Sequence, residues 1–69
     1  MTNRQLDELT LDSLEAADHI YEEEVKGLAR EFGVLSTAVR ASLKRLCKRD
    51  FAQREGGGWT IPSEDFDSE

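Results

Sequence analysis

The sequence contains few of the residues that build disulfides, metal sites or kinked helices. Its 69 residues include one cysteine, one histidine and one proline. One cysteine excludes a disulfide within the chain, and Cys47 with His19 falls short of the four ligands of a structural zinc site. No pair of carboxylates and no nucleophile with a neighbouring base stands out along the chain. We therefore expect no metal, no cofactor and no enzymatic activity on a small-molecule substrate.

Long apolar runs are absent as well. No stretch reaches the roughly 18 apolar residues by which a membrane-spanning helix is recognised, and the first residues are polar, unlike a secretory signal peptide. A lone cysteine suits a reducing compartment. We expect a cytoplasmic protein that has no membrane partner and that, at this length, forms one small domain.

Acidic residues outnumber basic ones, but the two kinds are segregated along the chain, whose formal net charge is −6. Residues 26–54 carry eight basic and two acidic residues and form a basic module of net charge +6, between flanks of −7 (residues 1–25) and −5 (residues 55–69). Phosphate binding depends on the local field, because the Debye length is about 8 Å at physiological salt. The acidic total therefore does not exclude a nucleic-acid partner. The flanks either keep the protein soluble, as in a salt-adapted host, or repel nucleic acid from the wrong face.

Two apolar stripes predict a pair of helices within residues 25–47. Their members recur at intervals of three and four residues, as on one face of a helix. The first stripe is Val25, Leu28, Ala29 and Phe32, and the second is Val39, Leu43, Leu46 and Cys47. Gly33 lies between the stripes and favours the left-handed conformation that ends a helix. The pattern predicts a helix over residues 26–32, a tight turn, and a helix over residues 36–49.

The chain here resembles the winged helix-turn-helix family. The resemblance rests on LAREFGV followed by TAVRASLKRLCKRDFAQREGGGWTI, and it covers roughly residues 11–62. It implies an α+β fold, mainly α, with three helices, a small β-hairpin wing, and a short strand at residues 23–25 that pairs with the wing. The chain departs from the family at Leu35, where a serine, threonine or proline usually opens the third helix, so Ser36 is the alternative cap.

The two ends of the chain are predicted from caps and composition. Residues 1–10 form either an arm or an extra helical turn that begins near Asn3, because Thr2 and Gln5 fit a capping box. The first full helix is expected over residues 11–22. Residues 63–69 are rich in acids and are expected to form a disordered tail.

The wing is predicted from a glycine-rich turn between two short apolar segments. Strands over residues 51–54 and 59–61 flank Glu55 and the three glycines 56–58. Phe51, Trp59 and Ile61 are expected to close the core beneath the helices.

The outward face of the predicted third helix is the candidate site. Because Val39, Leu43 and Leu46 point to the core, the opposite face presents Ser36, Thr37, Arg40, Ala41, Lys44 and Lys48. Small side chains on this face allow close approach to a groove, and an arginine suits a guanine edge or a phosphate. The base-facing candidates are Thr37, Arg40 and Lys44. The phosphate-facing candidates are Lys26, Arg30, Arg45, Lys48, Arg49 and Arg54.

The resemblance implies a protein that binds double-stranded DNA and regulates transcription by occupying an operator, as a homodimer or beside a protein partner. The alternative is a protein–protein interaction adaptor, in which the same scaffold presents a groove or a charged face to another protein. An adaptor should bind duplex weakly, lose that binding steeply with salt and show no sequence preference.

Overall fold

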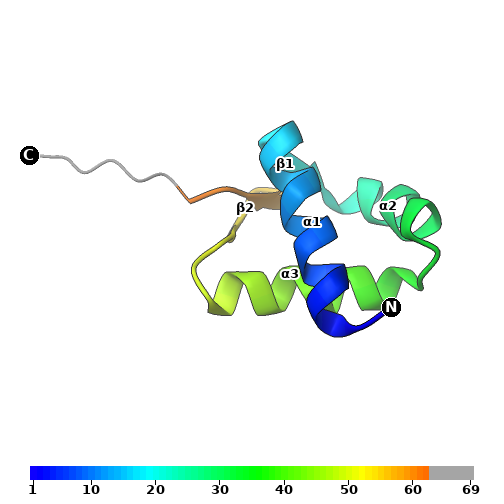
Figure 1. The fold of residues 1–69 in the computed structure, drawn as a ribbon. Coiled ribbons are helices and arrows are strands. Elements are labelled where there is room, and N and C mark those ends of the chain that lie inside the picture. Colours follow the sequence, from blue (N-terminus) through cyan, green and yellow to red (C-terminus); the bar gives the residue numbers. More distant parts are fainter. Residues whose placement is uncertain (63–69) are drawn as a thin grey trace, which may run out of the picture.

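The structure is a computed structural model that describes residues 1–62. It contains three helices and a three-stranded antiparallel sheet (Figure 1), so the predicted α+β fold with a winged-helix-like arrangement is confirmed. The elements in chain order are α1 (Asn3–Ala17), β1 (His19–Tyr21), the 3₁₀ turn η1 (Glu22–Glu24), α2 (Val25–Phe32), α3 (Ser36–Lys48), β2 (Gln53–Glu55) and β3 (Gly58–Thr60). The expected tail over residues 63–69 lies outside the described residues. None of the helices in residues 1–62 is long and apolar enough to cross a membrane.

The first helix begins and ends earlier than predicted, so the expected bounds of residues 11–22 are wrong. The capping box at its start is present: the Thr2 hydroxyl accepts from the Gln5 backbone N–H at 3.2 Å, and the Gln5 side chain accepts from the Thr2 N–H at 2.9 Å. Leu6 is buried, so the first turn belongs to the core-facing helix. The helix stops at Asp18, which is left-handed with φ 68° and donates its N–H to the Leu14 carbonyl.

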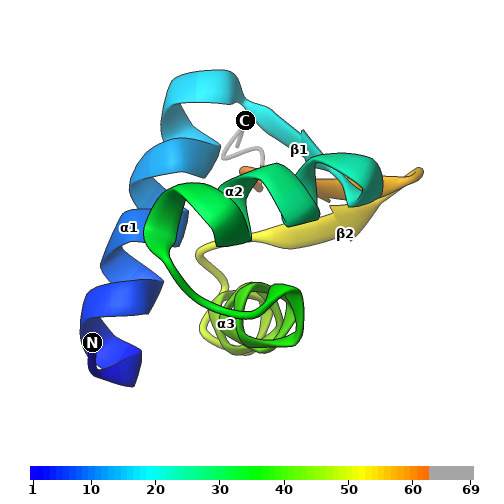
Figure 2. The ribbon, with the colours of Figure 1, turned by 90° about the vertical axis from the view of Figure 1, so that its right-hand side faces the viewer.

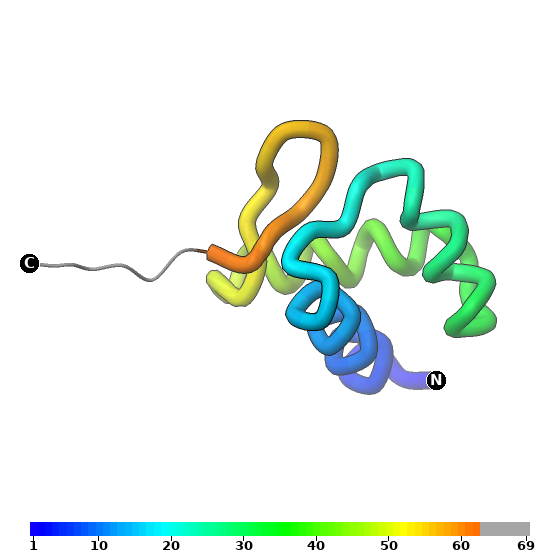
Figure 3. The backbone as a smooth tube through the Cα atoms, turned by 90° about the horizontal axis from the view of Figure 1, so that it is seen from above, coloured from blue at the N-terminus to red at the C-terminus, as the bar shows by residue number. Residues whose placement is uncertain are grey.

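The strand that joins the wing to the helices also lies earlier than predicted. It is β1 rather than residues 23–25, which fall within η1 and the start of α2. The strand order is β1-β3-β2, with Ile20 opposite Trp59 and Tyr21 opposite Gly58. Figure 3 shows the β2–β3 hairpin lying beside β1 and η1. Because β1 has three residues, it is defined by its pairing with β3 and has no periodicity of its own.

The turn between α2 and α3 follows the prediction except at the cap of α3. Gly33 ends α2 with φ 73°, and its N–H donates to the carbonyls of Ala29 and Arg30. The cap of α3 is Leu35, which has no side-chain hydrogen bond, so the alternative of Ser36 as the cap is wrong. The Leu35 carbonyl accepts from the backbone N–H groups of Ala38 and Val39, which begins the helix through the backbone alone.

The core lies where the three helices meet the sheet. Its buried members are Leu14, Ile20, Val25, Ala29, Val39, Leu43, Leu46, Ala52 and Trp59. Trp59 is therefore a core residue, as predicted, and Ile61 packs against the same cluster.

Phe51 was predicted in the core but is 47% exposed, and this prediction is wrong. Asp50, which takes a left-handed conformation with φ 65°, redirects the chain after α3. The N–H groups of Phe51 and Ala52 both donate to the Leu46 carbonyl. This tight turn leaves the small Ala52 buried and Phe51 on the surface.

Candidate nucleic-acid interface

The outer face of α3 is exposed and basic. Figure 2 shows α3 end-on at the lower edge of the molecule, with α2 and the sheet above it. Val39, Leu43 and Leu46 are buried on its inner side. The exposed residues opposite them are Thr37, Arg40, Ala41, Lys44 and Lys48, while Ser36 is half-buried at the helix start. No acidic residue occurs in α3, so the helix itself contributes only positive charges to this face.

Exposed basic residues also occur outside α3, at two places. Lys26 and Arg30 are exposed one turn apart on α2, and Arg49 is exposed just after α3. Within residues 1–62 neither these three cations nor Lys44 and Lys48 form an ion pair. Their charges are therefore available to an anionic partner.

Arg45, in contrast, is engaged inside the protein. Its Nε and Nη2 atoms donate to both carboxylate oxygens of Asp7 on α1, at 2.7 to 3.2 Å. The Asp7 side chain is 13% exposed and that of Arg45 is 35% exposed. The hydrogen bonds from Arg45 lower the pKa of Asp7, with a smaller contribution from Ser42, and Asp7 in turn raises the pKa of Arg45. Arg45 thus lies among the predicted phosphate contacts in sequence, but its guanidinium group already binds a carboxylate.

Two hydroxyl groups complete this cluster between α1 and α3. Ser42 is fully buried and donates to Asp7 Oδ1 at 2.6 Å, and its Oγ lies 3.2 Å from the hydroxyl oxygen of Thr10, which is also fully buried. Asp7, Ser42 and Thr10 were not predicted from the sequence as site residues. One signal was present: Thr10 falls four residues after Leu6 and four before Leu14, on the apolar face of α1.

A second acidic residue joins α3 to the wing. Glu22 Oε2 accepts from Arg54 Nη2 on β2 at 2.7 Å and lies 3.4 Å from Arg40 Nη1 on α3. Arg54 also lies over the Trp59 ring, 4.5 Å from its centroid. The hydrogen bond from Arg54, followed by the charge of Arg40, lowers the pKa of Glu22. Two of the predicted DNA contacts are therefore brought together, and they share one carboxylate.

These ion pairs involve the acidic N-terminal flank, residues 1–25. Asp7 and Glu22 belong to the flank of charge −7. Asp7 binds one arginine of the basic module, and Glu22 binds two. Part of that flank therefore neutralises charge on the folded surface.

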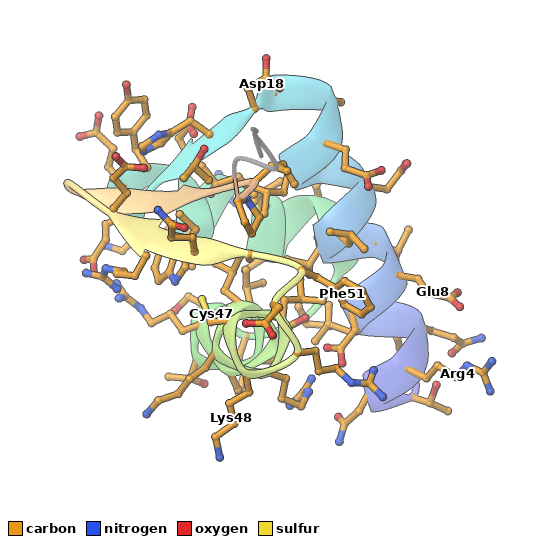
Figure 4. The ribbon with its side chains drawn as sticks, turned by 90° about the vertical axis from the view of Figure 1, so that its left-hand side faces the viewer. Arg4, Glu8, Asp18, Cys47, Lys48 and Phe51 are labelled. Atoms are coloured by element: carbon orange, nitrogen blue, oxygen red, sulfur yellow. The ribbon has the colours of Figure 1, made fainter. Side chains whose placement is uncertain are left out.

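An open groove of about 750 Å³ lies between α1 and the end of α3. Leu11, Leu46 and Phe51 give it apolar walls, and its charged lining consists of Arg4, Asp7, Glu8, Arg45, Lys48 and Arg49. Figure 4 shows Phe51 between the two helices, with Lys48 on one side and Arg4 and Glu8 on the other. Because Asp7 binds Arg45, the remaining charges leave the rim positive.

Residues 1–62 contain no group of three or more side chains that could hold a metal ion. His19 lies in β1 with its ring 4.2 Å from that of Tyr21, whereas Cys47 lies in α3. Partial burial raises the pKa of the Cys47 thiol. The cysteine therefore behaves as a small apolar residue beside the core.

Comparison with known proteins adds no relative to this picture. A scan against protein-family models, a search of curated proteins and a search of solved structures each gave no match to the chain. The resemblance to the winged helix-turn-helix family therefore stays a prediction, and the function is argued from the residues and their geometry.

Proposed function

We propose that the protein binds duplex DNA, with α3 in the major groove and the β2–β3 hairpin beside the sugar-phosphate backbone. The outer face of α3 is the observation that supports this. Arg40, Lys44 and Lys48 recur every fourth residue, with the small Thr37 and Ala41 among them. At 1.5 Å per residue the 13 residues of α3 span about 20 Å, and a helix of this kind fits the major groove, which is about 12 Å wide.

The side chains of the proposed interface form two groups, one that would contact bases and one that would contact phosphates. Thr37 and Arg40 lie in the first half of α3 and Lys44 just beyond its middle. These three side chains would face base edges, as those of the recognition helix do in helix-turn-helix proteins. Ser36 and Ala41 flank them. The cations around them would contact phosphates, which fix position and register, and these are Lys26, Arg30, Lys48, Arg49 and Arg54. Arg45 contributes chiefly to folding, because Asp7 binds it.

The proposed role is regulation of transcription by a cytoplasmic protein that occupies an operator. A single small domain covers few base pairs, so a homodimer or a second protein would supply the remaining specificity.

The first test is the salt dependence of duplex binding. With about four to six phosphate contacts, affinity for a mixed-sequence duplex should fall by about 10² to 10³-fold between about 50 and 200 mM salt. Lys48→Gln, which removes one of the proposed phosphate contacts, should weaken binding about three- to tenfold at the lower salt and reduce the salt slope by about 1. Fluorescence anisotropy of a labelled duplex measures both quantities.

Arg4→Gln is the matched control, because it removes the same charge from an exposed residue of α1 outside the proposed interface. It should change the affinity less than twofold. Absence of binding by the unmodified protein at the lower salt, or an equal loss in both variants, would contradict the proposal.

The groove between α1 and α3 supports a second candidate function, recognition of a protein partner. Its apolar wall at Phe51 and its positive rim complement an acidic segment that carries one aromatic side chain. A synthetic peptide of aspartates around one phenylalanine should shift the NMR signals of Leu11, Phe51 and Arg49. Phe51→Ala should lower its affinity about fivefold or more. The control is Leu9→Ala, which removes an exposed apolar side chain on α1 and should leave the peptide affinity unchanged. An equal loss of affinity in both variants would argue against binding in the groove.

A further inference from the structure

Glu22 occupies a junction between three parts of the proposed interface. Its side chain contacts Arg40 on α3 and Arg54 on β2 through the same oxygen, Oε2. Its backbone N–H donates to the carbonyl of Gly57 at the hairpin tip, at 2.8 Å. The carboxylate is thus held between the recognition helix and the wing by main-chain as well as side-chain bonds.

The two arginines do not depend on Glu22 for their general location. Arg40 is fixed by its place on α3, and Arg54 by strand β2 and by its stacking on the buried Trp59 ring. All three side chains are 41% to 54% exposed. A phosphate that approached both guanidinium groups would therefore meet the carboxylate at short range, in a setting that water and salt screen only in part.

We propose that Glu22 competes with phosphate for Arg40 and Arg54, and that it thereby lowers the affinity for DNA in general. The inference rests on the proposed DNA-binding function. The two arginines and the glutamate together carry a charge of +1, so DNA must displace or tolerate an acid in order to use both cations. A DNA sequence that places a guanine edge or a phosphate for bidentate arginine hydrogen bonds offsets the free-energy cost of displacing the Glu22 carboxylate. Non-specific DNA does not offset this cost.

Glu22→Gln tests the competitor, because glutamine keeps an acceptor oxygen for Arg54 but removes the negative charge. Affinity for a mixed-sequence duplex should rise about three- to tenfold at about 50 mM salt, and the salt slope should steepen by up to about 0.9. The matched control is Glu23→Gln, at the neighbouring exposed residue, which forms no ion pair with residues 1–62. The control should change affinity less than twofold. Circular dichroism checks that both variants are folded.

A third variant separates local competition from a change in total charge. In a protein that already carries Arg40→Gln and Arg54→Gln, adding Glu22→Gln should give a clearly smaller gain in affinity, because the competed cations are gone.

The outcomes distinguish this inference from the function on which it rests. An unchanged or weaker affinity in Glu22→Gln, with binding by the unmodified protein, overturns the competitor and leaves DNA binding intact. A weaker affinity would mean that the carboxylate positions the arginines. An equal gain in Glu22→Gln and Glu23→Gln also overturns it. Absence of duplex binding by every form overturns the proposed function and the inference together.

Discussion

Replacing Gly58 with alanine should destabilise the protein by about 3 kcal/mol. Gly58 lies in the central strand β3, opposite Tyr21 on one side and Glu55 on the other. A Cβ at this position would collide with the backbone carbonyl oxygen of Ile20 and would lie 2.8 Å from the Cα of Tyr21. Backbone atoms cannot rotate away as a side chain can, so relief of the clash requires β1 and β3 to separate.

The expected loss is a large part of the total stability. A domain of this size has a free energy of unfolding of roughly 3 to 9 kcal/mol, and a loss of about 3 kcal/mol lowers the melting temperature by about 12 to 24 °C. Thermal and urea unfolding, followed by the fluorescence of the buried Trp59, measure the change. Gly57→Ala is the control, because a Cβ there meets nothing within 4 Å. A Gly58→Ala protein within about 1 kcal/mol of the unmodified one would mean that the two strands are farther apart than described.

The helices α2 and α3 were predictable because their signals are local. The stripe that ends at Phe32, the glycine that follows it and the stripe that begins at Val39 all act within a few residues of the chain, and the observed bounds differ from the predicted ones by one residue. The start of α1 was also signalled locally, by the capping box of Thr2 and Gln5. Its extent was misjudged because Leu6 was not recognised as the first core-facing residue.

The remaining features depend on contacts between residues far apart in sequence. The Asp7–Arg45 pair spans 38 residues, and the bond from Arg54 to Glu22 spans 32. In neither pair do the residues next to one partner in the sequence indicate which residue the other partner is. The same reasoning applies to Phe51, whose apolar side chain suggested burial, although the left-handed Asp50 places it at the surface. The candidate interface could therefore be predicted as a helix face, whereas the acids that form ion pairs with three of its arginines could not.

Removal of the Asp7 carboxylate should have the second large effect. Asp7→Ala leaves the Ser42 hydroxyl buried without its charged acceptor and leaves the Arg45 guanidinium partly buried without a counter-ion. Hydrogen bonds to charged groups contribute about 1.5 to 3 kcal/mol each, and an unsatisfied buried partner adds its own cost. Because Arg45 retains partial access to water, we expect a net loss of about 2 to 3 kcal/mol. Urea unfolding near neutral pH measures it.

Asp12→Ala is the matched control for this change. It removes one aspartate from the same helix, at an exposed position with no hydrogen bond to another side chain of residues 1–62. The gain in helix propensity is the same in both variants, so the difference between them reports the cluster of Asp7, Ser42 and Arg45. A loss below about 0.5 kcal/mol in Asp7→Ala would show that the cluster contributes little to folding.

The pH dependence gives the same contact an independent test. The pKa of Asp7 is lowered in the folded protein, first by its hydrogen bonds from Arg45, so the unfolded chain binds the proton more readily than the folded one. The stabilisation is therefore fully present above the unfolded aspartate pKa of about 3.9 and is lost as the pH falls from there through the lower folded-state pKa. The stability gap between the unmodified protein and Asp7→Ala should be constant from about pH 7 to 5 and should shrink as the pH falls below about 4. Subtracting the stability of Asp7→Ala from that of the unmodified protein cancels the contribution of the other acidic residues, because both proteins contain them. A gap that stays constant down to about pH 3 would mean that the Asp7 pKa is not lowered, and that Arg45 is free to bind phosphate as the sequence alone predicted.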